Sequence, residues 1–518
     1  ALVGPAPYSG GNVVDITPGG STSIGGGLDL AIDQFSGDSS RDEVILLLTD
    51  GMENTPPMID EIDHRIGDRR LCIVGYGNET NLNGPILASL AILNDGSYTI
   101  ASDELSLKKF FASCFGEIFD EPFSTDPEFF LPKSVTSAES MPFLVCGEET
   151  ITIVVGWDTK ASSLLFNVIA PDGSPVNSGH PDVQVLAGRT WRFARIKLPH
   201  NGQQDGTWTV NVFRPGGGEF PPPSIDIRYF INVVAKGGPS LKRVPNPKRF
   251  YTGDTINPLV RLSYPTGTSP EHAHTKVTIT RPTESTGNIL SKSGLDQPVN
   301  NAGDTIDPIY ATLIRLASNS GTPLITYQKE TVDLFDDGAH DDGAMEEDGI
   351  FGNPLHDLLK HEGIYRFHAQ TTFGHDCQAS REVVWSVYVA TKVDENNTDI
   401  SSTVIGDTPT GKKMVKFTIT PKDKYGNFVG PGKADSLNFT GVAGSTIIGG
   451  TKDNGDGSYD VVVEFDPNTG DEPGIVVGQP DTPPSVFCRQ DSKSKIPFWL
   501  WIIIFILVLI ILLLLFFK

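Results

Sequence analysis

The first 120 residues alternate between two hydrophobic patterns. Apolar residues at helical spacing predict four helices, at residues 25–35, 57–66, 85–93 and 105–119. Short continuous apolar runs predict three strands, at residues 44–48, 71–74 and 97–100. Strands that alternate with helices in this way favour a parallel sheet covered on both faces.

The pattern changes after Pro122, where short strand-like runs separated by turns replace the helical spacing. These runs predict strands at residues 151–157, 163–169, 191–198, 208–213 and 225–234. Similar runs follow at residues 259–264, 276–280, 382–389, 414–420 and 459–465. Many short strands with regular turns are typical of β-sandwiches. We therefore expect Ig-like sandwiches from residue 123 to residue 485.

The fold class predicted from these patterns is multidomain. An α/β domain is expected at residues 1–122, followed by all-β sandwiches and a C-terminal transmembrane helix. The predicted sandwiches span residues 123–238, 239–393 and 394–485, and a polar stalk spans residues 486–495. An uncharged apolar run at residues 496–517 is long enough to cross a bilayer as a helix.

The orientation of that helix is open from the charges alone. Arg489, Lys493 and Lys495 precede the apolar run and Lys518 follows it, which by the positive-inside rule predicts a tail-anchored protein with a cytosolic N-terminal portion. The Ig-like modules favour the opposite orientation. We expect a single-pass membrane protein whose large N-terminal portion is extracellular, with the tail-anchored arrangement as the alternative.

The net charge and the cysteine spacing exclude two classes of binding site, for nucleic acid and for zinc held by cysteines. The 518 residues carry a formal net charge of −24, and nucleic acid is excluded as a partner because its phosphates need a basic surface. The five cysteines form no zinc-type cluster. Cys72 lies in an apolar run and is expected to be a buried structural thiol, whereas Cys114 and Cys146 are one candidate disulfide pair.

The candidate chemistry begins at Asp50, which directly follows an apolar strand in the sequence DEVILLLTDGMEN. In an open parallel sheet, ligands gather beyond the carboxyl ends of the strands. Upstream, the glycine-rich loop PGGSTSIGGGL opens a helix, and Thr22 in it offers a hydroxyl oxygen. A hydroxyl and a carboxylate on adjacent loops favour Mg²⁺ or Ca²⁺. The alternative is that Thr22 caps the helix and Asp50 caps a turn.

The segments GGSTSIGGGLDLA and ILLLTDGMEN, with the later LCIVGYGNETNLNGPILASLAILNDG, resemble the von Willebrand factor type A (VWA) domain over residues 10–120. The resemblance implies a doubly wound, Rossmann-like fold with a metal-ion-dependent adhesion site. In this chain Thr22 and Asp50 match the threonine and aspartate of that site. The resemblance also implies Mg²⁺, or Mn²⁺ or Ca²⁺, as cofactor, and a protein partner that offers an acidic residue.

The chain departs from the VWA pattern in one respect. The family's first metal loop, Asp-x-Ser-x-Ser, occurs nowhere in it, and the elements that should precede Asn12 are missing. We therefore expect an incomplete domain that holds part of its metal shell, with further sequence upstream of Ala1.

A second candidate site is the acidic stretch VDLFDDGAHDDGAMEEDGIF at residues 332–351. Its carboxylates would suit Ca²⁺, although the EF-hand spacing is absent. The alternative is a run of solvated Asp-Gly turns. Together with GIYRF at residues 363–367, the stretch resembles a segment of calcium-activated chloride channel regulators. The candidate calcium ligands are Asp336, Asp337, Asp341, Asp342 and Asp348.

No catalytic motif such as HExxH or GxSxG is present, so we expect a protein that is not an enzyme. Sequons at Asn78, Asn396 and Asn438 permit glycosylation. The main hypothesis is a metal-dependent protein-binding or adhesion module of a single-pass cell-surface protein. The alternatives are a channel or secretion modulator like the chloride channel regulators, and a structural surface stalk with a degenerate VWA domain.

Overall fold

The structure is a computed structural model of the chain, in which compact clustering defines two units. Unit 1 comprises Ala1–Ile289 and Asp296–Thr391, and unit 2 comprises Leu290–Leu295 and Lys392–Lys518. Each unit is considered by itself below. The residues that the structure describes are 22–35, 43–77, 82–118, 123–125, 127–215, 225–246, 249–295, 308–320, 324–343, 345–374, 378–442, 444–468, 472–480 and 482–488.

The N-terminal part of unit 1 contains the predicted helices and strands. In chain order they are α2 (Ile24–Ile32), β1 (Val44–Thr49), α3 (Ile59–Ile62), η1 (Asp63–Arg65), β2 (Arg70–Tyr76), α4 (Gly84–Leu93), β3 (Tyr98–Ala101) and α5 (Glu104–Ile118). The strands pair in parallel in the order β1-β2-β3. The seven elements predicted in this region are confirmed, with α3 and η1 together covering the predicted helix at residues 57–66.

Helix α5 begins at a side-chain cap that also ties it to the neighbouring sheet. Asp103 Oδ1 accepts hydrogen bonds from the Ser106 N–H and hydroxyl, 2.8 Å each, and Arg228 Nη1 on β12 (Ile227–Lys236) lies 2.7 Å from Asp103 Oδ2. Burial opposes ionisation of Asp103. The hydrogen bonds from Ser106 and the ion pair with Arg228 outweigh this and lower the pKa of the carboxyl to about 2.

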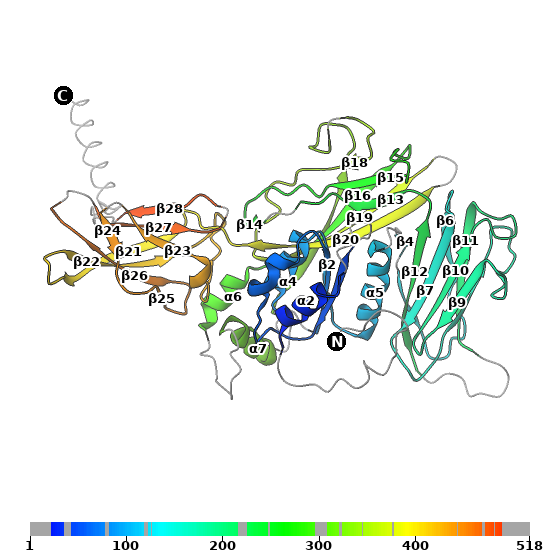
Figure 1. The fold of residues 1–518 in the computed structure, drawn as a ribbon, viewed down its shortest axis with the longest axis horizontal. Coiled ribbons are helices and arrows are strands. Elements are labelled where there is room, and N and C mark those ends of the chain that lie inside the picture. Colours follow the sequence, from blue (N-terminus) through cyan, green and yellow to red (C-terminus); the bar gives the residue numbers. More distant parts are fainter. Residues whose placement is uncertain are drawn as a thin grey trace, which may run out of the picture. The chain divides into compact units, whose positions relative to one another are not determined.

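The later part of unit 1 is dominated by one mixed sheet of 11 strands (Figure 1). Its main order is β17-β16-β19-β20-β4-β12-β7-β10-β9, with β14 paired to β20 and β5 to β12. Its strands are β4 (Phe123–Thr125), β5 (Glu128–Leu131), β7 (Thr150–Trp157), β9 (Val183–Ala187), β10 (Trp191–Lys197), β12 (Ile227–Lys236), β14 (Phe250–Tyr251), β16 (His274–Pro282), β17 (Tyr327–Leu334), β19 (Gly363–Phe373) and β20 (Ala379–Ala390).

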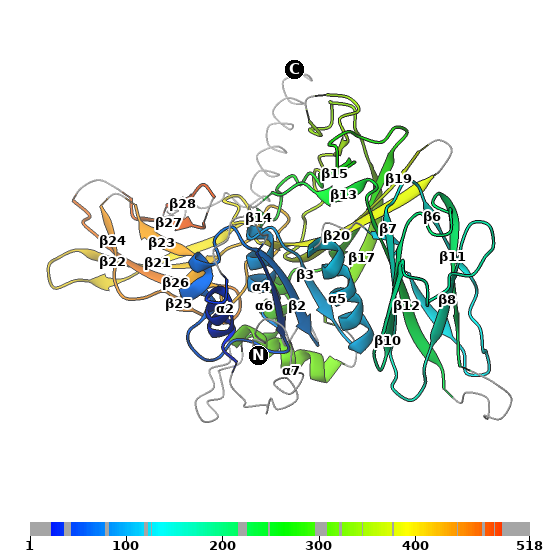
Figure 2. The same ribbon diagram turned by 45° about the vertical axis from the view of Figure 1, so that its right-hand side comes forward.

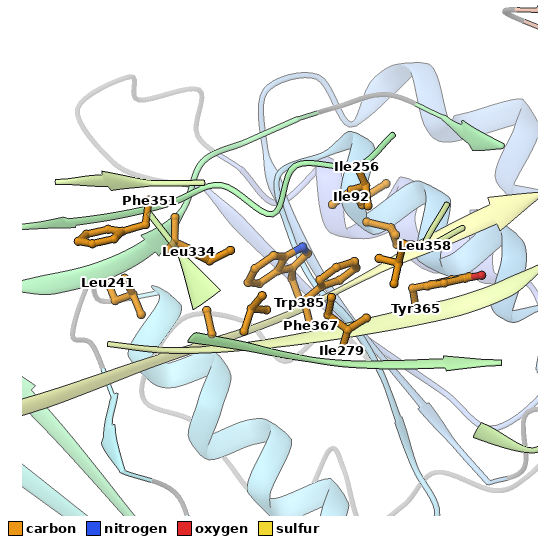
Figure 3. Close-up of a cluster of buried hydrophobic side chains, with 14 of the residues drawn as sticks. Ile92, Leu241, Ile256, Ile279, Leu334, Phe351, Leu358, Tyr365, Phe367 and Trp385 are labelled. Atoms are coloured by element: carbon orange, nitrogen blue, oxygen red, sulfur yellow. The ribbon is translucent and has the colours of Figure 1, made fainter. Parts of the chain in front are cut away.

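Two three-stranded sheets contribute to the cores of unit 1. The sheet β6-β11-β8 shares with β7 and β12 a core that includes Trp157 and Trp208. The sheet β13-β15-β18 shares with β16, β19 and β20 a second core, in which Phe367 and Trp385 stack (Figure 3). The strand bounds are β6 (Met141–Val145), β8 (Leu165–Ile169), β11 (Gly206–Phe213), β13 (Ser240–Arg243), β15 (Val260–Ser263) and β18 (Ile350–Phe351).

Two helices in the β region escaped the sequence analysis. They are α6 (Thr286–Ser293) and α7 (Pro308–Ser320). Both are amphipathic, and α7 buries Ile309 and Leu313, which are one helical turn apart. Strand-like runs dominate the sequence after Pro122, so no helix was predicted at these two positions.

The prediction of a doubly wound α/β fold is wrong. Within the described part of the chain the parallel sheet has only three strands, and most regular structure is β. Helix α4 packs on β2 and β3 and also on β19 and β20, while α5 packs on β3, β7 and β12 (Figure 2). The Ser386 hydroxyl on β20 donates to the Tyr98 carbonyl on β3 at 2.6 Å. Helices α4 and α5 therefore bury part of their apolar surface against the large sheet. In a doubly wound fold, further strands of the parallel sheet would cover that surface.

The predicted single-pass membrane location also has to be corrected. None of the helices that the structure describes is long and apolar enough to span a bilayer. The predicted helix at residues 496–517 lies outside the described residues. A membrane location is therefore not supported, in either orientation.

Unit 2 consists of two facing antiparallel sheets around a single core. The orders are β21-β22-β26-β24, with β25 paired to β26, and β23-β27-β28. Apolar residues alternate along β22 and β26, which places Phe417 and Tyr459 in the core. The elements are β21 (Asp399–Asp407), β22 (Lys413–Thr420), η3 (Ala434–Ser436), β23 (Asn438–Gly441), β24 (Ser445–Ile447), β25 (Lys452–Asp453), β26 (Tyr459–Phe465), β27 (Gly474–Gly478) and β28 (Ser485–Cys488).

The structure shows whether Cys114 and Cys146 form a disulfide. Cys72 is fully buried in β2, as predicted. Cys114 is also buried and takes part in no disulfide, whereas Cys146 is disulfide-bonded. Cys114 and Cys146 are therefore not a pair.

Candidate functional site

The structure brings Thr22 and Asp50 to the same edge of unit 1. Thr22 immediately precedes the α2 cap, and Asp50 immediately follows β1. The loops that carry them are in contact, because a Cβ placed on Gly51 would lie 3.9 Å from Thr22 Oγ1. The Thr22 hydroxyl and the loop of the exposed Asp50 carboxylate thus meet at the carboxyl end of β1. This is the end at which ligands collect in parallel sheets.

Other residues perform the structural tasks that were the alternative for Thr22 and Asp50. Ser23 caps α2, since its Oγ accepts a hydrogen bond from the Gly26 N–H at 3.1 Å. Thr49 closes the turn after β1, because its hydroxyl donates to the Gly51 carbonyl at 2.9 Å. Within the described residues, no hydrogen bond of the Thr22 hydroxyl or the Asp50 carboxylate is found. Both oxygens are therefore available to a ligand.

Two residues that the sequence analysis missed hold this edge together. Glu53 accepts from the Gly25 N–H at 2.6 Å and from the Ile59 N–H at 2.7 Å, so one carboxylate joins the starts of α2 and α3. Asn54 Oδ1 accepts from the Thr22 N–H at 2.7 Å, and the Thr22 carbonyl accepts from the Asn54 N–H at 2.9 Å. Glu53 and Asn54 both lie in the DGMEN stretch directly after the strand. This position at a strand end is the sequence feature by which they could have been found.

These contacts decide which side chains fit a divalent cation. Both Glu53 oxygens already accept backbone hydrogen bonds, so Glu53 orients the loops. The Thr22 hydroxyl and the Asp50 carboxylate are hard oxygen donors, which is the donor type that Mg²⁺ and Ca²⁺ prefer. Both side chains are therefore of the donor type that such an ion binds. They would supply two of its roughly six or more ligands. The assignment of Thr22 and Asp50 as ligands stays a prediction.

The close approach of α2 to the following loop leads to a stability prediction. A Cβ on Gly25 would lie 2.3 Å from the Met58 carbonyl oxygen, whereas a Cβ on Gly27 would meet nothing within 4 Å. Gly25→Ala is therefore expected to destabilise unit 1 by about 1–3 kcal/mol, since backbone has to move. Gly27→Ala, in the same helix, should stabilise it by up to about 1 kcal/mol. Thermal unfolding of the two variants measures both effects, and a neutral Gly25→Ala variant would contradict this packing.

The acidic loop between β17 and β18 uses most of its carboxylates internally. Asp336 accepts from the N–H groups of Asp348 and Gly349 at 3.1 and 2.9 Å. Asp342 is 1% exposed, and its Oδ2 accepts from the N–H groups of Asp337 and Gly338 at 2.6 and 3.0 Å. Burial raises the pKa of Asp336, and the nearby charges of Asp348 and Asp342 raise it further. These bonds support the turn alternative for this loop.

Two observations in the same loop bear on Ca²⁺. Asp342 Oδ1 is buried and has no hydrogen-bond partner in the described residues. Asp341, by contrast, is exposed at a positive φ of 50°, and Asp337 contacts His340 Nδ1 at 2.9 Å. Calcium binding by this loop stays a prediction, with Asp342 as its best-placed residue.

The sequons fall at accessible positions where the structure describes them. Asn396 lies in an exposed turn before β21, and Asn438 is exposed at the start of β23. Asn78 lies outside the described residues. Glycosylation stays a prediction at all three.

Comparison with known proteins gives no family. No family model and no curated protein matches the chain. Similar solved structures include a von Willebrand factor type A protein from Catenulispora acidiphila, at 16% identity over 49% of this chain and 45% of that chain, with a TM-score of 0.18. The Escherichia coli adhesin FdeC has 13% identity over 68% and 97%, with a TM-score of 0.20. The pilus adhesin SpaC from Lactobacillus rhamnosus GG has 8% identity over 93% and 75%, with a TM-score of 0.20.

These similar structures include one VWA protein and two adhesins. The match spans less than half of the length of the C. acidiphila chain. They do not support the resemblance to chloride channel regulators. Because all three TM-scores lie well below 0.5, no residue role is transferred from these proteins.

Proposed function

We propose that this chain is a non-catalytic protein-binding module with a role in adhesion. In this proposal a divalent cation held by Thr22 and Asp50 is contacted by an acidic residue of a protein partner. The observation that carries it is the contact of two loops at one sheet edge, each of which carries an oxygen donor that is not engaged as a cap or turn residue within the described part of the chain.

The chemistry of the donors explains how such an edge could bind a protein. Mg²⁺ has octahedral coordination and usually keeps several exchangeable waters when proteins supply only one or two oxygens. When bound, the ion would offer positive charge to a partner's carboxylate. The role of the chain is to present the Thr22 hydroxyl and the Asp50 carboxylate on loops that Glu53 and Asn54 hold in place.

The cation is tested first, by calorimetric titration of the full chain with Mg²⁺ and Mn²⁺. Asp50→Ala and Thr22→Val are expected to lower the affinity at least about tenfold, since even changes behind a metal ligand cost this much. Asp60→Asn, at an exposed position on α3, is the control and should bind as the unmodified chain does. Equal cation binding by Asp50→Ala and the control would rule out this site.

The partner is tested next, with an immobilised library of short peptides that contain Asp or Glu. Peptide capture should require Mg²⁺, stop on addition of EDTA and be absent for Asp50→Ala. Capture that persists through both changes would overturn metal-dependent binding. No capture under any of these conditions would favour the second candidate, a structural spacer, for which the extensive β-sandwich content is the supporting observation.

A further inference from the structure

Three side chains with metal-ligating atoms meet at the open end of the β9–β10 hairpin in unit 1. They are His180, Asp182 and His200, and one ligating atom of each lies within 4.8 Å of those of the other two. The imidazole rings pack edge to face with centroids 4.6 Å apart, and His180 Nδ1 lies 3.6 Å from Asp182 Oδ2. In the sequence the whole hairpin separates His180 and Asp182 from His200, so no short motif marks the cluster.

Backbone hydrogen bonds hold the three residues in this arrangement. The Asp182 carbonyl accepts from the Lys197 N–H at 2.9 Å, which continues the antiparallel pairing of Val183 with Ile196. The His180 carbonyl accepts from the Val183 N–H at 2.9 Å. His200 and Gln203 exchange two backbone bonds of 2.9 Å, which close a turn. The cluster is therefore built on paired strand ends, which favours a fixed ligand geometry.

The buried histidine of the cluster, His200, has one ring nitrogen without a hydrogen-bond partner among the described residues. His200 is 1% exposed, and its Nδ1 has no hydrogen-bond partner in the described residues. Its other ring nitrogen lies 3.2 Å from the Asn201 side-chain amide. A buried polar nitrogen without a partner is costly, so a ligand that binds it would remove that cost. A metal-bound imidazole keeps a proton on its other ring nitrogen and donates it, so metal binding at Nδ1 requires the Asn201 amide to turn its oxygen toward Nε2.

We propose that His180, Asp182 and His200 bind a divalent transition-metal ion of the zinc class. Two imidazoles and one carboxylate suit Zn²⁺ and its neighbours, whereas Mg²⁺ and Ca²⁺ prefer oxygen ligands throughout. The site is thus chemically distinct from the edge at Thr22 and Asp50. Its donor set, three protein ligands in a fixed geometry, leaves a fourth position for water or another molecule.

A pocket beside the cluster indicates how that fourth ligand could reach the ion. Asp182 lines an open pocket of about 550 Å³, together with Arg195 and Lys197. Solvent therefore reaches the carboxylate side of the cluster, while His200 is enclosed on the other. The two cationic side chains favour an anionic or water-derived ligand over a cationic one.

The test is Zn²⁺ titration of the full chain by calorimetry, with Co²⁺ absorption as a report on the ligand geometry. The expected result is saturable binding of about one Zn²⁺ and a tetrahedral Co²⁺ spectrum. His180→Gln and Asp182→Asn are the main variants, because both positions are partly exposed and should fold, which circular dichroism checks. Each is expected to lose affinity at least about tenfold and to lose the Co²⁺ spectrum.

Two controls separate this site from others in the chain. His274→Ala removes a well-exposed histidine of the same unit, and His368→Ala removes another histidine that is paired with a carboxylate, Glu382 at 3.0 Å. Both should bind Zn²⁺ as the unmodified chain does. The proposal is overturned if the unmodified chain binds no Zn²⁺ saturably, or if folded His180→Gln and Asp182→Asn bind it as tightly as His274→Ala.

Discussion

Arg381→Met is expected to lower the free energy of unfolding of unit 1 by about 3–5 kcal/mol, the usual cost of breaking a buried ion pair from one side. Arg381 on β20 and Glu148, between β6 and β7, are both fully buried and form an ion pair. Removing the guanidinium leaves the Glu148 carboxylate without its counter-charge, far from water.

Further contacts make this guanidinium a connecting point within unit 1. Arg381 Nε donates to the Pro239 carbonyl and Nη1 to the Ser380 carbonyl, 2.8 Å each. The guanidinium also lies over the Phe373 ring, 5.3 Å from its centroid. Glu148 in turn accepts from the Cys146 N–H. One side chain therefore joins strands that the sequence analysis placed in two separate sandwiches.

Two variants show whether charge or packing is responsible. In Arg381→Met/Glu148→Leu both charges are gone, so part of the lost stability should return, although the Cys146 N–H remains without its acceptor. Glu104→Gln breaks a partly exposed pair with Lys108 and should cost less than about 1 kcal/mol. Scanning calorimetry follows the transition of each variant. An Arg381→Met variant no less stable than Glu104→Gln would contradict the buried pair.

Trp385→Ala is the second large effect and is expected to cost about 3–5 kcal/mol in unit 1. The indole is 5% exposed in the core between β13-β15-β18 and the large sheet. It stacks on Phe367 with ring centroids 5.1 Å apart and planes 10° apart (Figure 3). Truncation removes this stacking and leaves a cavity that its strand-borne neighbours can fill only in part.

The matched control is the preceding residue of the same strand. Val384 is 47% exposed, because successive side chains of β20 point to opposite faces, and Val384→Ala should change stability by no more than about 0.5 kcal/mol. Trp385→Phe retains an aromatic ring and should fall between the two. Equal denaturant midpoints for Trp385→Ala and Val384→Ala would show that this core does not support unit 1.

The local elements of the fold could be predicted from the sequence. The helices and strands between residues 24 and 118, and ten of the strands after residue 122, follow from hydrophobic periodicity, because a helix or strand exposes one side and buries the other over a short stretch of chain. The long strands β17, β19 and β21 were not predicted. The same reasoning placed Thr22 and Asp50 at strand and helix ends, where the structure brings their loops together.

Only the tertiary structure decided how those elements combine. Periodicity says that α4 and α5 have apolar sides, and it does not say that these sides pack on β19, β20 and β12 in place of further parallel strands. Pairings such as Arg381 with Glu148 join residues far apart in sequence, and their partner is selected by burial and charge once the sheets have formed.

The candidate sites divide in the same way. The sequence by itself determined that Thr22 lies at the start of a helix and Asp50 at the end of a strand, because helix and strand boundaries leave a local signature. It could not determine that Ser23 and Thr49 take the capping tasks, since these residue types are interchangeable in that role. The meeting of His180, Asp182 and His200 was decided by the register of a hairpin, which depends on cross-strand pairing rather than on any short motif.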